Sequence, residues 1–97
     1  MLTYRTEPEK FIEMADILKA LSHPARLCIV KTLYEKQSCN VTSMKNCLGE
    51  AQSTVSQHIS RLRSANIVAG KRKGNMIYYS LVDDRVRRLV ETIINEQ

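Results

Sequence analysis

Acidic residues are missing from about a third of the sequence: no Asp or Glu lies between Ala51 and Val82. The same window contains five basic residues: Arg61, Arg63, Lys71, Arg72 and Lys73. The whole chain has 15 Lys and Arg against 10 Asp and Glu, so the window supplies the entire formal net charge of +5. A local excess of this kind is the electrostatic signature of a surface that contacts nucleic-acid phosphates.

Other absences limit the class of protein. No apolar run approaches the roughly twenty residues that a membrane span needs, and the first residues lack the basic and apolar blocks of a signal peptide. We therefore expect a cytoplasmic protein in which Cys28, Cys39 and Cys47 are thiols. The sequence has no phosphate-binding loop and no Ser-His-Asp or Cys-His constellation, so we expect no enzymatic activity. A length of 97 residues fits a single domain, 1–97, with one modest core.

The segment 52–65 is predicted to form an amphipathic helix. Val55, Ile59 and Leu62 recur at i, i+4 and i+7, which places them on one apolar stripe. The opposite side carries short hydroxyls and an amide, on Ser53, Ser56, Gln57 and Ser60. Such a face is suited to reading base edges in a major groove. A solvated surface helix would have the same pattern, but the basic excess that follows favours DNA.

Two neighbouring segments complete a DNA-binding motif. A short helix is expected to begin at Thr42 as its cap and to end at Gly49 in a left-handed conformation, which gives a helix-turn-helix with segment 52–65. After Asn66, the β-prone runs 67–72 and 76–81 are predicted to form a hairpin. Its tip carries Lys71, Arg72 and Lys73, which suits a basic wing, 71–75, that lies along a phosphate backbone.

The helices expected at the two ends of the chain have apolar stripes that need more partners than one small core provides. The first begins near Thr6, as its cap, and the last covers 83–95. Between them, a helix over 24–35 is expected to turn Leu27 inward and to keep Ile29 on its flank. The residues expected at a dimer interface are Phe11, Met14, Leu18, Val86, Leu89, Val90 and Ile93.

The predicted order is four helices, a hairpin and a helix: a mainly α fold with a small β-hairpin, that is, a winged helix-turn-helix. The segments LSHPARLCIV (21–30), QSTVSQHISRLRSANIV (52–68) and KGNMIYYSL (73–81) resemble the ArsR/SmtB family of bacterial transcriptional repressors. The resemblance covers nearly the whole chain. It implies a homodimer, formed by the terminal helices, that binds a palindromic operator in double-stranded DNA and leaves it when an inducer is sensed.

The resemblance also assigns roles to residues. The family's recognition helix carries a Gln-Ser-x-x-Ser-Gln-type pattern, which implies base and phosphate contacts for Gln52, Ser53, Ser56 and Gln57. The backbone contacts expected beside these are Thr54, Ser60, Arg61, Lys71, Arg72 and Lys73. His23 and His58 are interpreted as structural, His23 at a helix start and His58 bonding locally.

The signal that the protein senses is harder to predict. Many family members bind metal through an Asp-x-His on the last helix, but here Asp83, Asp84 and Arg85 occupy that place, and an Arg does not ligate a cation. Another family site uses Cys-Val-Cys, of which only Cys39 is present. We expect no metal and no cofactor, and we recognise no site for a small inducer in the sequence.

Two alternatives stay open. One is a thiol-based repressor that senses redox state, persulfide or a soft metal through Cys39 with Cys28 or Cys47, although we expect Cys47 to be buried and Cys28 to be partly exposed. The other is a winged helix that docks a protein and does not bind DNA.

Overall fold

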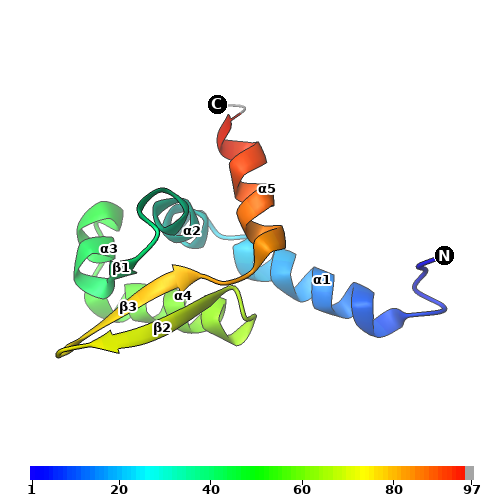
Figure 1. Ribbon diagram of the computed structural model, residues 1–97, viewed down its shortest axis with the longest axis horizontal. Coiled ribbons are helices and arrows are strands. Elements are labelled where there is room, and N and C mark those ends of the chain that lie inside the picture. Colours follow the sequence, from blue (N-terminus) through cyan, green and yellow to red (C-terminus); the bar gives the residue numbers. More distant parts are fainter. Residues whose placement is uncertain (96–97) are drawn as a thin grey trace.

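Residues 1–95, which the computed structural model describes, form five helices and three strands (Figure 1). Glu96 and Gln97, the end of the expected 1–97 domain, lie outside this range. The elements in chain order are α1 (Pro8–Leu21), α2 (Pro24–Lys36), β1 (Cys39–Asn40), α3 (Val41–Leu48), α4 (Gln52–Ser64), β2 (Val68–Lys73), β3 (Met76–Leu81) and α5 (Asp84–Asn95). The predicted winged helix-turn-helix order is confirmed, and β1 is an addition to it.

The three strands form one antiparallel sheet in the order β1-β3-β2. β2 and β3 are joined by a two-residue turn, and the positive φ of +67° falls on its first residue, Gly74, as in a type II′ turn. β1 adds only Cys39 and Asn40, opposite Tyr79 and Tyr78 of β3. A strand of two residues is too short to leave an alternating pattern in the sequence.

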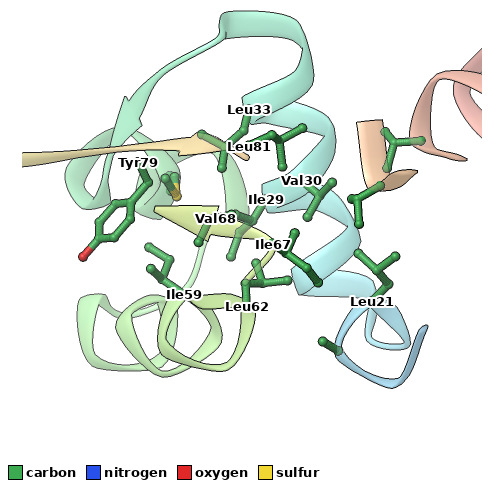
Figure 2. Packing of buried hydrophobic residues seen from close by; sticks show 14 of the residues in the cluster. Leu21, Ile29, Val30, Leu33, Ile59, Leu62, Ile67, Val68, Tyr79 and Leu81 are labelled. Atoms are coloured by element: carbon green, nitrogen blue, oxygen red, sulfur yellow. The ribbon is translucent and has the colours of Figure 1, made fainter. Parts of the chain in front are cut away.

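The core lies between α2, α4 and the sheet (Figure 2). Its fully buried side chains come from α2, α3, α4 and α5 and from the residue before β2: Ile29, Val30, Leu33, Met44, Val55, Leu62, Ile67 and Val86. The prediction for α2 was wrong for two residues. Ile29 is buried, whereas Leu27, expected inside, is 41% exposed. The spacing of apolar residues shows which side of a helix is apolar. Which of those residues are buried depends on how the neighbouring elements pack against the helix.

Two of the expected helix caps are wrong. The Thr6 hydroxyl bonds to Thr3 and not to the start of α1, whose N-terminal flanking residue is Glu7. At the start of α3, the side chain of Asn40 accepts a hydrogen bond from the backbone N–H of Ser43 at 2.9 Å, so Asn40 is the cap in place of Thr42. Asn40 has the extended backbone that a cap needs, whereas Glu7 makes no side-chain hydrogen bond to α1.

The left-handed positions that the sequence predicts are confirmed. Gly49 ends α3 with a φ of 70°, and Asn66 follows α4 with a φ of 59°. Asp83 caps α5 by accepting from the backbone N–H groups of Arg85 and Val86, at 2.8 and 3.1 Å. These turns fix the directions in which α4 and the hairpin leave their neighbours.

The hairpin depends on the missing side chain of Gly70. A Cβ there would lie 2.9 Å from both Ile77 Cγ2 and Tyr79 Cε1, so the buried Tyr79 ring rests on the bare backbone of β2. We predict that Gly70→Val destabilises the fold by about 1–3 kcal/mol despite the high strand propensity of Val. Urea unfolding measures the change. Ala69→Val is the matched control, because the side chain at 69 is exposed; an equal loss in both variants would contradict the packing argument.

Candidate nucleic-acid interface

Helix α4 presents one polar face outward. Its apolar stripe, Val55, Ile59 and Leu62, is at most 3% exposed, and Figure 2 shows Ile59 and Leu62 pointing from α4 toward Ile67 and Val68. This anchorage turns the other side of the helix to solvent. The exposed residues of that side are Gln52, Ser53, Ser56, Gln57, Ser60 and Arg61, whereas Thr54 is half-buried. All are residues that the sequence predicts to contact DNA.

The N-terminal end of α4 is open. Ala51 stands at the cap position, makes no side-chain hydrogen bond to the helix, and the first turn contains no acidic residue. The backbone N–H groups of that turn therefore have no side-chain partner, and the positive end of the helix dipole faces solvent. Such an end favours an anion such as a phosphate. Glu50, just before it, is the one nearby carboxylate on this connection.

The basic residues of the hairpin divide between its two faces. Cross-strand partners share a face, so Lys71 with Tyr78 and Lys73 with Met76 lie on one side, and Arg72 with Ile77 lies on the other. The Arg72 side is the one that carries Val68, Tyr79 and Leu81 into the core (Figure 2). All three cationic side chains are exposed. The hairpin can therefore offer cations from both faces to a duplex.

Three polar side chains join α4 to the start of α2. His23 caps α2, because the backbone N–H of Ala25 donates to its Nδ1 at 3.1 Å. Arg26 donates through Nε to the carbonyl of Ala20, and its Nη1 lies 3.4 Å from Nδ1 of His58 on α4. The two imidazole rings lie with their centroids 4.5 Å apart. His58 is structural, as predicted, but its contacts are with α2 and are not local.

The three cysteines are free thiols on different elements. Cys39 is buried in β1. Cys28 is half-buried on α2, where it lines a groove between α2 and α5 together with Leu27, Val90 and Ile93. Cys47 is exposed on α3, so its expected burial is wrong: Met44 points inward from that short helix and Cys47 points away. No disulfide joins the thiols that the sequence suggested as a sensor.

Arg85 ties two helices together. Its guanidinium lies 3.0 Å from Asp83 Oδ2 and 3.2 Å from Glu13 Oε1 of α1. The hydrogen bond from Arg85 holds the pKa of Asp83 below its usual value, and the backbone N–H groups of Val86 and Arg85 act in the same direction. Within residues 1–95, no three His, Cys, Asp or Glu side chains gather in a group that could hold a metal ion.

The residues expected at the dimer interface do not all lie at the surface. Val86 and Val90 are 1% and 4% exposed within the single chain, so this part of the prediction is wrong: they pack α5 onto its own core. Phe11 and Met14 are half-buried, and the Phe11 ring meets Tyr4 edge-on at 6.3 Å. Leu18, Leu89 and Ile93 are exposed and stay available to a second copy.

Residues 23–69, which include α2, the helix-turn-helix and the first residues of the hairpin, match the model of a protein family described as bacterial regulatory protein, arsR family. Over 85 residues, the chain is 36% identical to an HTH-type transcriptional regulator of Methanocaldococcus jannaschii, covering 88% of this chain and 96% of that protein. The chain belongs to the ArsR family. The resemblance drawn from the three sequence segments is therefore confirmed, and the protein is a DNA-binding transcriptional regulator.

Solved structures of two transcriptional repressors superpose on nearly the whole chain. The transcriptional repressor PagR of Bacillus anthracis is 36% identical, with a TM-score of 0.82, and the match covers 90% of this chain and 99% of that one. The transcriptional repressor BigR of Xylella fastidiosa is 33% identical, with a TM-score of 0.82 and coverage of 97% and 95%. In this ArsR-family chain, no helix within residues 1–95 is long and apolar enough to cross a membrane.

Proposed function

We propose that this ArsR-family regulator is a cytoplasmic, homodimeric repressor that reads a palindromic operator with α4 and contacts the flanking phosphates with its wing. The observation that carries the proposal is the joint exposure of the acid-free polar face of α4 and the basic hairpin. Gln and Ser side chains exchange hydrogen bonds with base edges, while Arg and Lys neutralise phosphates. The relatives named as transcriptional repressors support repression as the outcome.

The proposed assignment of roles follows from position. Gln57, Ser56 and Ser53 lie on the exposed side of α4 opposite its buried stripe, so they are proposed to read bases. Gln52 and Thr54 lie in the open first turn and are proposed to contact phosphate together with its backbone N–H groups. Ser60, Arg61, Lys71, Arg72 and Lys73 are proposed to contact the DNA backbone.

A second copy of the chain would complete the reading surface. Leu18 of α1 is 57% exposed and Ile93 of α5 is 47% exposed, and each lies on a terminal helix that is packed on the core through Ile17 and Leu21 of α1 or Val86 and Val90 of α5. A two-fold axis through these helices would cover both patches and would present two α4 helices. Such a dimer reads two half-sites about one turn of the duplex apart, on the order of 34 Å.

The base-reading role of α4 is tested by Ser56→Ala with Gln57→Ala. Both side chains are exposed, so the variant should keep its unfolding midpoint, while affinity for the selected operator falls by about 1–3 kcal/mol per lost base contact. Fluorescence anisotropy with an operator duplex selected from a random pool measures the loss, and a random duplex gives the unspecific level. Unchanged discrimination between the two duplexes would show that other residues read the bases.

The wing is tested by Arg72→Ala and Lys73→Ala. Each should weaken binding to operator and random duplexes by a similar factor, and should reduce the slope of log affinity against log salt by about one. Lys10→Ala is the matched control, because Lys10 lies in the first turns of α1, whose N-terminal end is at the opposite end of the molecule from the wing tip (Figure 1). Binding that ignores salt would favour a protein-docking module.

The dimer is tested by Leu18→Glu and Leu89→Glu. A carboxylate buried at an interface without a partner is strongly unfavourable, so each change should raise the dimer dissociation constant by at least about tenfold in sedimentation measurements. Ile77→Glu is the control, because Ile77 is an exposed apolar residue of the wing. A wild-type chain that sediments as a monomer at micromolar concentration would refute the proposed dimer.

A further inference from the structure

The contact between Arg26 and His58 joins the helix that is proposed to read DNA to two others. Arg26 leaves the first turn of α2, donates to the Ala20 carbonyl at the end of α1, and reaches His58 on α4 with Nη1. His58 follows Gln57 directly on α4, so the contact of its ring is made next to the proposed reading face. Arg26 and His58 are 32 positions apart in the sequence, so this is a tertiary contact.

The hydrogen bond from Arg26 fixes the protonation state of the His58 ring. A guanidinium carries only donors, so Nδ1 of His58 must accept, and it must carry no proton. Nδ1 of His23 accepts from the backbone N–H of Ala25. The contact with Arg26 therefore requires a neutral His58 ring, with its proton on Nε2.

The charges around His58 act against its protonation. Arg26 and His23 approach the ring from α2, whereas Glu50, ahead of α4, is the nearby carboxylate that would favour a cation; Arg61 follows one turn later on α4 itself. Burial lowers the pKa of His58 below its usual value of 6.5, and His23 and Arg26 lower it further, while Glu50 acts in the opposite direction. A proton on Nδ1 would replace the hydrogen bond from Arg26 by repulsion between two cations.

We propose that Arg26 and His58 are positioning residues for operator recognition, which hold α4 in its binding orientation only while the His58 ring is neutral. The inference rests on the proposed role of α4 as the reading helix. It makes operator affinity dependent on pH: the contact is complete above about pH 6.5 and is lost as the pH falls through the lowered pKa of His58. Added positive charge alone would have the opposite effect, because phosphates attract cations.

The test measures affinity for the selected operator duplex from about pH 8 to about pH 5.5 at constant ionic strength, a range that brackets the ordinary pKa of histidine. Wild-type affinity should fall about threefold to tenfold toward the acid end. His58→Gln should keep the neutral-pH affinity, because its amide oxygen can accept from Arg26, and should abolish the fall. Arg26→Ala should lower the affinity at neutral pH and flatten the profile.

The chain has only two histidines, which makes a clean control possible. His23→Asn removes the other imidazole ring but keeps a side chain that caps α2, so the acid fall should persist in this variant. The inference is overturned if His58→Gln retains the fall, or if wild-type affinity rises as the pH is lowered. Failure of the proposed function is distinguishable, because it would appear at neutral pH as equal affinity for operator and random duplexes.

A measurement on the wild-type protein covers the case in which a variant does not fold. By linkage, a ligand that requires neutral His58 must lower the pKa of that ring when it binds. Titration of the two imidazole rings by NMR, with and without the operator duplex, should show a lower pKa for His58 in the complex and release of a proton on binding. An unchanged or raised pKa in the complex would overturn the inference.

Discussion

The burial of one apolar stripe on α4 is the constraint on which the proposed reading surface depends. Isolated helices of fewer than about 12–15 residues are marginal in water, and α4 has 13 residues and no side-chain cap at its start. Val55, Ile59 and Leu62 therefore supply through tertiary packing the stability that the segment lacks locally. They also set the rotation of the helix about its axis, and with it the residues that face outward.

The same helix shows why an uncapped start is useful. A carboxylate or hydroxyl cap at position 51 would stabilise α4 by about 1 kcal/mol, but it would occupy the N–H groups that a phosphate needs, and an acidic cap would repel the phosphate. The acid-free window extends this arrangement through the hairpin. Ion pairs lie elsewhere, on α1, on α2 and at the α1–α5 junction, within the part of the chain that the structure describes.

Local signals in the sequence were sufficient for the helices, the hairpin and the polar face of α4, but not for the two-residue strand β1. Periodicity identified the helices, and Gly49 and Asn66 marked their ends, because a left-handed position strongly restricts the residue type. Periodicity was insufficient where a helix can pack against more than one neighbour. Leu27 was assigned to the core and Val86 to a dimer interface, because an apolar stripe does not show which element covers each of its residues. The contact of Arg26 with His58 leaves no local signal at all.

Two of the polar contacts that link helices of this protein respond differently to pH. Arg85 joins α5 to Glu13 of α1 and to Asp83; the hydrogen bonds raise the pKa of Arg85 and lower that of Asp83, so both groups keep their charges across the neutral range. The contact of Arg26 with His58 instead requires a neutral imidazole, and the pKa of that ring is lowered from its usual value of 6.5. The junction of the terminal helices is therefore constant near neutrality, whereas the proposed sensitivity to pH lies at the attachment of α4.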